Sequence, residues 1–353
     1  MNDPRTSARR VALLFVMLLV FSFAAHSQTM PVKKSGAAPQ QKKGVSALPK
    51  VSLLPRFVPG QTFRYEIESE TSTDTKRLGL ASDPEGPSSL VVVWNATVRV
   101  EVLPEEGGAP GGIRLRCTYE KSTASIRSDT FDPQADVTRE QYQKLEGKVV
   151  EFTLDASGKV KSVSGLEGTS GTEKAAQAAR EWIAQLGASA GAPPDGVSVG
   201  QAWSSEQPAD SLPIAGLIWR TDSQYLRNEA CRPANPGVPE GPGAADSAAN
   251  ANAAPDCAVI LANLNLVRGK NSRDTTPPEF RKNGVQSAGK WNGTAQSLLY
   301  VSLATGMVVS VTQSGKEEMD VVLTSNHNTS MRYFGTIQSR SQVTLVDIPQ
   351  TAK

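Results

Sequence analysis

Apolar and polar residues alternate with a period of two along much of the chain. In the first half the alternation is clearest at residues 63–68, 94–102, 113–119 and 150–154, where single polar residues separate large apolar ones. A period of two places successive side chains on opposite faces of a strand, so each segment predicts a strand with one buried and one wetted face. Such strands are typical of an antiparallel sheet.

The second half of the chain continues this pattern, with Gly, Pro, Asn and Asp between the apolar segments. The predicted strands lie near residues 214–228, 257–268, 294–303, 306–312, 317–324 and 330–347. We therefore predict a mainly β protein built on one large curved antiparallel sheet, shaped like half of a barrel.

One segment changes to a helical period. Ser170 and Glu173 have the spacing of a capping box, and apolar residues follow at helical spacing until Gly187. This pattern predicts one amphipathic helix at residues 172–186. Its apolar stripe would pack most simply on the concave face of the sheet.

Two short segments echo one another. Phe57–Phe63 (FVPGQTF) resembles Val197–Trp203 (VSVGQAW), and a hairpin with a glycine follows in each half, at Gly158 and at Gly306. The echo favours a duplicated β-meander, with halves at 51–168 and 197–347 and the helix between them. The alternative is that these turn residues recur by chance, as they do in many β proteins.

The N-terminal residues have the three parts of a secretory signal peptide. Basic residues lie at Arg5, Arg9 and Arg10, an apolar run of 15 residues covers Val11–Ala25, and small residues occupy positions 25 and 27. An uncleaved membrane anchor is the alternative, but a span requires about 20 apolar residues. We expect cleavage after residue 27 and a periplasmic or extracellular product with no stable transmembrane anchor. No Cys follows the apolar run to carry a lipid.

Composition divides the rest of the chain. Residues 28–50 hold almost no large apolar side chain and predict a disordered tether, so the β-rich domain should occupy 51–347 and a short tail 348–353. The chain has 37 basic and 35 acidic residues, and without residues 1–27 it has 34 of each. This balance gives no reason to expect a nucleic-acid partner.

Two of the three cysteines flank an insert without a core of its own. Residues 232–256 between Cys231 and Cys257 are mostly Pro, Gly, Ala, Asn and Asp, which predicts disorder. In an oxidising compartment the two cysteines would form a disulfide that closes this loop, the alternative being two unrelated thiols. Cys117 lies on the apolar face of a predicted strand, where a buried, inert thiol is expected.

Few residues offer catalytic chemistry. His327 is the one histidine after the leader, which excludes a zinc site with two His ligands, and no G-x-S-x-G motif supplies a serine nucleophile. The adjacent pairs Glu105–Glu106 and Glu317–Glu318 would point to opposite faces of a strand, so we interpret them as solvated charges. The sequence predicts no catalytic residue, no cofactor and no metal site.

The order of these features resembles a group of uncharacterised secreted bacterial β-proteins. Members begin with an apolar-x-x-Gly-Gln-x-aromatic strand and carry a Gly-Gln-x-Trp in mid-chain. The matching residues here are Phe57, Gly60, Gln61, Phe63, Gly200, Gln201 and Trp203. A curved sheet with an inserted helix is also similar to the half-barrels of LolA/LolB-type periplasmic lipoprotein carriers. That resemblance implies a cavity between sheet and helix that accepts an acyl chain or another apolar group.

Three functional hypotheses follow. The first is a non-catalytic envelope protein that binds a lipid or another apolar ligand, lined by Trp94, Trp182 and Trp203, unless these tryptophans simply pack the core. The second is a structural or protein-interaction module of the cell envelope, held off a surface by the tether. The third is a hydrolase that uses two carboxylates.

Overall fold

The structure is a computed structural model that describes most of the chain beyond residue 48. The described residues are 49–79, 89–104, 113–130, 132–154, 160–165, 192–209, 212–231, 256–269, 275–326 and 329–347. The predicted signal peptide, the predicted helix at 172–186 and the predicted tail lie outside these ranges. So does the predicted insert, except that Asp256 already belongs to a strand.

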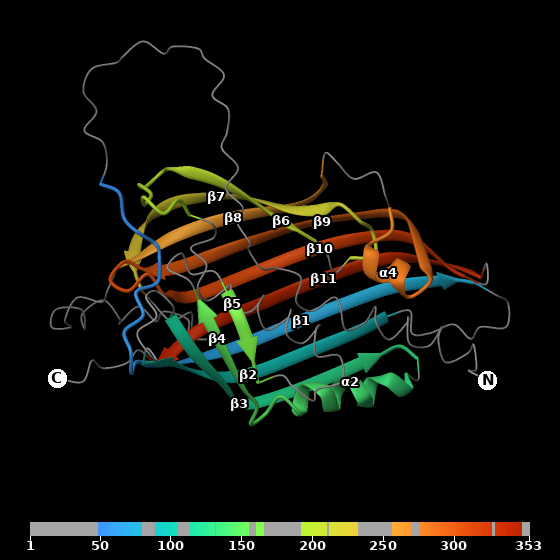
Figure 1. Cartoon of the computed structure of the whole chain (residues 1–353), viewed down its shortest axis with the longest axis horizontal. Helices are drawn as coiled ribbons and strands as arrows, with labels where there is room; N and C mark the ends of the chain where they lie inside the picture. The colour runs from blue at the N-terminus through green and yellow to red at the C-terminus, as the bar shows by residue number, and fades with distance from the viewer. Residues whose placement is uncertain are drawn as a thin grey trace, which may run out of the picture.

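One antiparallel sheet forms the body of the protein (Figure 1). It has eleven strands. The order across the sheet is β5-β4-β3-β2-β1-β11-β10-β9-β8-β7-β6. The strands are β1 Thr62–Leu78, β2 Ser89–Leu103, β3 Ile113–Ser128, β4 Val149–Leu154, β5 Val160–Ser164, β6 Ala202–Pro208, β7 Leu217–Ala230, β8 Asp256–Arg268, β9 Val285–Ser302, β10 Val308–Ser325 and β11 Ser330–Asp347. The prediction of a mainly β protein with a large curved antiparallel sheet is confirmed.

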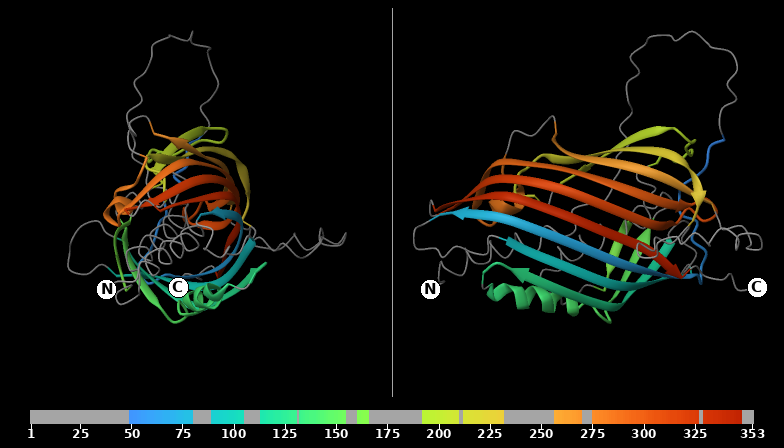
Figure 2. Two further views of the ribbon diagram at one scale, coloured as in Figure 1. Left: turned by 90° about the vertical axis from the view of Figure 1, so that its right-hand side faces the viewer. Right: turned by 180° about the vertical axis from the view of Figure 1, so that it is seen from behind.

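The first and last strands meet in the middle of the sheet, and the edges belong to strands that are consecutive in the chain. β1 pairs with β11, and the two parts of the chain extend from this seam in opposite directions. Because all neighbours are antiparallel and the number of strands is odd, β5 and β6 point the same way. The antiparallel pattern therefore cannot continue from one edge to the other, and the sheet is a strongly curved open one (Figure 2).

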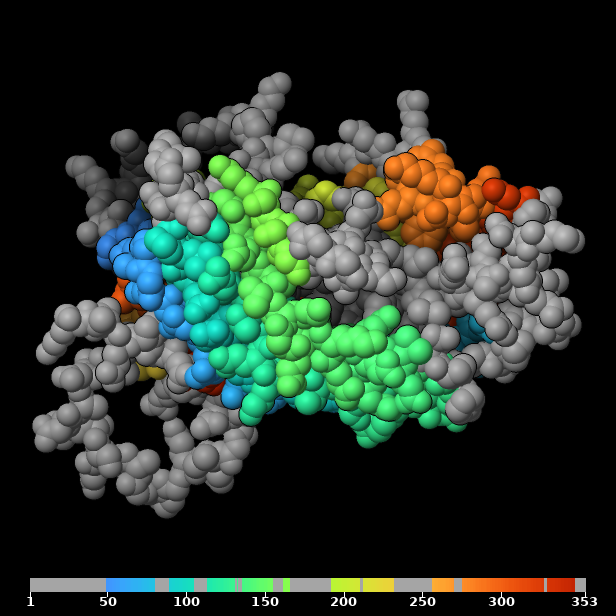
Figure 3. All heavy atoms as spheres, turned by 60° about the horizontal axis from the view of Figure 1, so that its bottom comes forward, coloured from blue at the N-terminus to red at the C-terminus, as the bar shows by residue number. Residues whose placement is uncertain are grey.

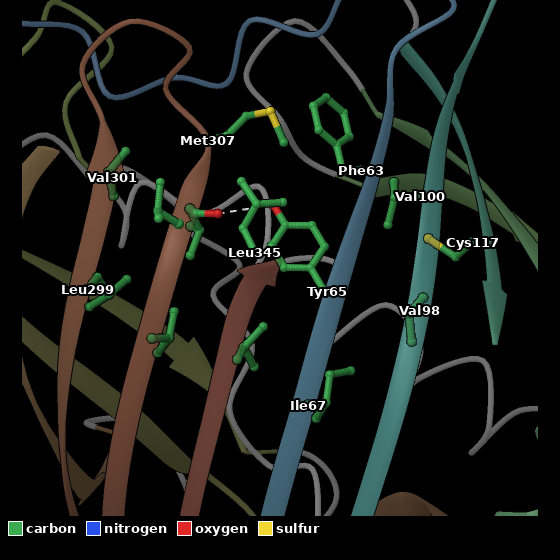
Figure 4. Packing of buried hydrophobic residues seen from close by; sticks show 14 of the residues in the cluster. Phe63, Tyr65, Ile67, Val98, Val100, Cys117, Leu299, Val301, Met307 and Leu345 are labelled. Carbon is green, nitrogen blue, oxygen red and sulfur yellow. Dashed lines mark hydrogen bonds between the residues drawn. The ribbon is translucent and has the colours of Figure 1, made fainter. Parts of the chain in front are cut away.

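At one end of the sheet, which we call the disulfide end, three segments cover the concave face. They are residues 49–61, residues 192–201 and the hairpin 302–308. Val51 and Val197 form an isolated antiparallel bridge with N···O distances of 2.8 and 2.9 Å, and Leu53 is buried beside them. Figure 4 shows the packing at this end, where the Tyr65 hydroxyl donates to the carbonyl of Val308 at 3.0 Å.

The opposite end, which we call the α4 end, has a second apolar cluster. Ala209, residues 212–216 and the short helix α4 (Pro278–Lys282) lie over strands β7 to β11 there. The cluster contains Ala209, Leu212, Ile214, Leu217, Trp219, Leu266, Val285, Trp291, Met319, Val321, Leu323 and Ile337. The concave face is thus packed separately at its two ends.

A helix that the sequence analysis did not anticipate covers part of β3. Helix α2 (Pro133–Gln143) follows β3 and lies along its second half, beyond the stretch that pairs with β4 (Figure 3). Its residue Tyr142 packs against Trp94 with ring centroids 5.6 Å apart. The sequence pattern predicted a single helix. That prediction was incomplete, because α2 and α4 both lie elsewhere in the chain.

The two echoed segments form the same turn. Gly60 and Gly200 have φ angles of +84° and +82°, a conformation that favours glycine. In each turn the glutamine side chain accepts from a backbone N–H at 3.1 Å, Val58 for Gln61 and Ser198 for Gln201. Each turn opens a strand, β1 or β6, and hydrogen-bonds to the strand after that one, β2 or β7. Duplication of a β-meander stays a prediction. A duplicated structure would be expected to share this turn geometry.

Candidate functional site

The register of the sheet aligns polar side chains in rows across its concave face. Directly paired residues of antiparallel strands share a face, so the pairing can be followed from β2 to β6. One row, which we call the serine row, contains Trp94, Ser69, Ser341, Gln313, Ser297, Ala262, Ser223 and Trp203. Two predicted ligand-lining tryptophans therefore lie at opposite ends of one row.

A second row lies two residues closer to the α4 end, and we call it the small-residue row. It contains Val92, Thr71, Ser339, Gly315, Ala295, Leu264, Thr221 and Ser205. Together the two rows form what we call the polar band. Toward the disulfide end the next row is apolar, with Ala96, Ile67, Val343, Val311, Leu299, Ile260 and Tyr225. On strands β9 to β11 the polar band therefore lies between the two apolar clusters, whereas its members Val92, Trp94, Ala262 and Trp203 belong to the cluster at the disulfide end.

Two hydroxyls in the polar band are buried and make no hydrogen bond. Thr71 is 4% exposed and Ser223 is 2% exposed, and neither Oγ atom has a hydrogen-bond partner within the ranges described above. A third hydroxyl, that of Ser297, donates to Oε1 of Gln313 at 2.7 Å. Leaving a buried hydroxyl without a partner costs about 1–3 kcal/mol, which makes Thr71 and Ser223 unusual in a folded protein.

Beside the polar band lies a buried carboxyl group. Glu317 is 5% exposed, and its Oε2 accepts a hydrogen bond from the indole nitrogen of Trp291 at 2.6 Å. Its Oε1 has no hydrogen-bond partner, and no basic side chain pairs with Glu317, in the part of the chain that the structure covers. Burial raises the pKa of Glu317, and the hydrogen bond from Trp291 opposes that shift only in part.

Glycine residues make room around this carboxyl group. Gly293 pairs with Glu317, and a Cβ added to Gly293 would lie 2.6 Å from the ring of Trp219 and 3.2 Å from Cγ of Glu317. On β10 itself, Gly315 lies two residues away on the same face. Glu317, Trp219 and Trp291 therefore form one group in which two glycines replace side chains.

The interpretation of Glu317 as a solvated charge is wrong. Its neighbour Glu318 is exposed and pairs with Lys316 at 2.8 Å, but Glu317 itself faces inward. The alternation along β10 indicates that Glu317 faces inward. Every second residue from Val311 belongs to the inward face, and this series includes Glu317, Met319 and Val321. The two glutamates do point to opposite faces, as expected.

The three predicted ligand-lining tryptophans differ in their surroundings. Trp94 is 1% exposed, donates from its indole nitrogen to Ser122 Oγ at 2.9 Å, and packs under α2. Its contacts are those of a core residue. Trp203 is buried near the β6 edge, and Trp182 lies outside the described residues. The sequence analysis did not single out Trp219 or Trp291, which flank Glu317.

The cysteines behave as predicted. Cys231 and Cys257 form a disulfide with a Cα–Cα distance of 5.0 Å, linking the end of β7 to the start of β8. Cys117 is buried among apolar residues, and burial raises the pKa of its thiol. His327 lies outside the described residues, within which no cluster of three or more His, Cys, Asp or Glu residues could hold a metal ion.

Carboxylates on the convex face are paired with arginines. Glu151 lies 3.3 Å from Arg114 and 2.8 Å from Arg116, and Glu120 lies 2.6 Å from Arg64. These arginines lower the pKa values of Glu151 and Glu120. The serine row, the small-residue row and the apolar row contain no carboxyl group. Together with Glu317 they therefore do not supply the pair of carboxylates that the hydrolase hypothesis requires.

Comparison with known proteins identifies no family. No protein-family description and no curated protein sequence matches the chain. A structure of lipovitellin, which addresses lipid–protein interactions, aligns with a TM-score of 0.42 and 10% identity over 84% of this chain. The chain spans about a quarter of that protein's length, 26%. The structure of DynF, from the dynemicin biosynthesis pathway of Micromonospora chersina, has a TM-score of 0.14 and 9% identity, covering 86% of this chain and 92% of DynF.

No helix in the described ranges is long and apolar enough to span a membrane.

Proposed function

We propose that this is an exported protein that binds an amphipathic, lipid-like ligand on the concave face of its sheet. The observation that carries the proposal is the polar band, in which Thr71 and Ser223 are buried and have no hydrogen-bond partner among the described residues. Since β1 and β7 are five strands apart, a ligand with a polar group at this level and an apolar chain along either cluster would satisfy one of those hydroxyls. It would also extend the apolar packing.

The width of the sheet supports the same proposal. Side chains just fill a sheet that closes with about eight strands, whereas wider sheets leave room for ligands. This sheet has eleven strands, and the middle of its concave face carries mostly small residues such as Gly315, Ala295 and Ser339. Such short side chains fill little of the space between the walls of the sheet.

Export is supported by the leader-like pattern in residues 1–27 and by the cysteine chemistry. The Cys231–Cys257 disulfide is stable in oxidising compartments and rare in the reducing cytosol. We propose the cell envelope as the location, as for the lipoprotein carriers that the sequence resembles.

Ligand binding can be tested with the full secreted chain. Native mass spectrometry of protein purified without detergent should show a bound lipid-like mass that organic extraction removes. The extracted protein should then enhance the fluorescence of Nile red, an uncharged apolar probe. Absence of both a bound mass and Nile red binding would refute the proposal.

A matched pair of variants locates the ligand. Ser339→Phe places a large ring in the small-residue row, whereas Gln338→Phe places the same ring on the exposed convex face of the same strand. Ser339→Phe should weaken Nile red binding about tenfold or more, and Gln338→Phe should leave it unchanged. Equal effects in two folded variants would place the ligand elsewhere.

The open edges of the sheet favour a second candidate, a protein-interaction module. β5 and β6 have no strand paired to their outer sides within the described residues, and such edges can accept a strand from another protein. Crosslinking in the native cell envelope would test this candidate. A defined partner linked through β6 would support it, and recovery of the protein only as an uncrosslinked monomer would count against it.

A further inference from the structure

The charges on the concave face restrict which head group it can accept. Two basic residues lie on the concave rows of the described strands, Arg77 and Arg268, and both lie at strand ends near the α4 end. The polar band itself offers hydroxyls, the Gln313 amide and, beside it, the carboxyl group of Glu317. An anionic head group placed here would meet no basic side chain of the described strands and would lie near a group that can itself become negative.

We propose that the polar band selects an uncharged, hydroxyl-bearing head group, such as the glycerol of a monoacylglycerol, and that Glu317 and Thr71 hydrogen-bond to it. This inference rests on the proposed function and names its ligand class. It makes Glu317 a binding residue rather than a structural one.

The hydrogen-bonding capacity of Glu317 fits such a head group. Oε2 already accepts from Trp291, so Oε1 is the atom available to a ligand. A protonated carboxyl group donates one hydrogen bond, which a ligand hydroxyl or ester oxygen can accept. Every side chain that faces Glu317 from β7, β8, β9 and β11 is uncharged: Trp219, Leu266, Trp291 and Ile337. Among these described strands, therefore, no charge competes with the ligand.

The positions of the two groups suit one head group. Thr71 pairs with Ser339 on β11, and Glu317 pairs with Ile337, two residues further along the same strand. With standard strand spacing the Cα atoms of Thr71 and Glu317 are roughly 12 Å apart. Gly315 and Ser339 lie between them and carry no long side chain, so a glycerol ester can reach both.

A cationic head group is disfavoured by the surroundings of Glu317. Binding an amine here would require Glu317 to lose its proton inside an apolar cluster, and burial of the resulting ion pair carries a desolvation cost. An uncharged head group leaves the carboxyl group neutral. Hydroxyls such as Thr71 are also the groups that pair well with other hydroxyls.

The test compares three ligands that share one tail. Monododecanoylglycerol, dodecanoate and dodecylamine, each below its aggregation concentration, compete with Nile red for the full chain after lipid extraction. We expect monododecanoylglycerol to bind about tenfold more tightly than either charged ligand. Because this ligand does not titrate, its affinity should fall about fivefold as pH rises through the pKa of Glu317, which burial raises.

Three variants assign the effect to named residues. Glu317→Gln keeps an acceptor for Trp291 and a donor for the ligand, so it should retain the preference and lose the pH dependence. Glu318→Gln, next to it on the convex face, should behave like the original protein. Thr71→Val should weaken the binding of monododecanoylglycerol about fivefold and leave the binding of Nile red unchanged.

The outcomes separate the two proposals. If dodecanoate or dodecylamine binds as tightly as monododecanoylglycerol, or if Glu317→Gln keeps the pH dependence, the head-group inference is wrong while Nile red binding still supports the proposed function. If neither Nile red nor any of the three ligands binds, the proposed function fails as well.

Discussion

The indole nitrogen of Trp291 donates a hydrogen bond to Oε2 of Glu317 at 2.6 Å, and both side chains are buried. The bond joins neighbouring strands β9 and β10 on the concave face. Within the described residues it is the one hydrogen bond that the carboxyl group accepts, and no basic side chain forms an ion pair with Glu317 there. Burial favours the neutral form of such an acid, so the free energy of unfolding should depend on pH.

The free energy of unfolding should fall as pH rises, because of Glu317. An unfolded glutamate releases its proton at about pH 4.3, and burial raises the pKa of Glu317 in the folded state. Between those two pKa values the folded state holds more protons, so rising pH favours unfolding. The stabilisation is complete below about pH 4 and is lost as pH rises through the folded pKa. Urea titrations across this range measure it.

Glu317→Gln should remove that part of the pH dependence and raise stability at neutral pH relative to the original protein. Glu318→Gln is the control, since its side chain is exposed and pairs with Lys316. Glu317→Leu should instead cost about 1–3 kcal/mol, because it removes the carboxyl group that accepts from the Trp291 N–H. Identical pH profiles for Glu317→Gln and Glu318→Gln would contradict the assignment.

Removing the disulfide should destabilise the protein at the disulfide end of the sheet. The bond closes a loop with a sequence separation of 26, for which chain entropy predicts a loss of about 3 kcal/mol in a Cys231→Ser, Cys257→Ser double variant. Denaturant unfolding with and without a reductant measures the effect. A reductant should lower the stability of the original protein and leave the double variant unchanged. A double variant as stable as the oxidised protein would refute the prediction.

Tyr65→Phe should destabilise the disulfide end without disturbing its packing. The Tyr65 hydroxyl is fully buried and donates to the carbonyl of Val308, which ties β1 to the start of β10 (Figure 4). Losing this bond leaves a buried carbonyl with less hydrogen bonding, at a cost of about 1–2 kcal/mol. Tyr300→Phe, at a partly exposed position, is the control and should change little. Thermal unfolding distinguishes the two variants, and equal melting temperatures would contradict the role given to Tyr65.

Period-two alternation predicted the sheet well, and the places where it failed share a cause. The apolar pattern predicted a strand from residue 294 and two separate strands within residues 306–324, whereas β9 starts at Val285 and β10 is continuous. Glycines caused both errors, because they were taken as turn residues. Gly293 and Gly315 instead lie within strands, where they leave space for Trp219 and for Ser339.

The site was harder to predict than the fold, because it depends on register. No sequence pattern reveals that Ser69 lies beside Ser341, or that Trp94 and Trp203 end the same row, since these residues are far apart in the chain. Glu317 could have been assigned to the buried face from the alternation of β10 alone. Helix α2 begins at Pro133, which is a common first residue of a helix, but its apolar stripe is weak.

The two Gly-Gln turns should respond alike to mutation, as a duplicated structure requires. Gly60→Ala and Gly200→Ala each place a side chain at a positive φ, and no atom lies within 4 Å of either new Cβ. The cost is therefore conformational, and we expect about 1–2 kcal/mol for each variant. Gln61→Ala and Gln201→Ala should likewise lose similar amounts, about 1 kcal/mol each, because each removes one side-chain acceptor from a backbone N–H. Urea unfolding of the four single variants provides the measurement. If one turn tolerates both changes while the other does not, the two turns are not equivalent in energy, and the case for duplication from their shared geometry fails.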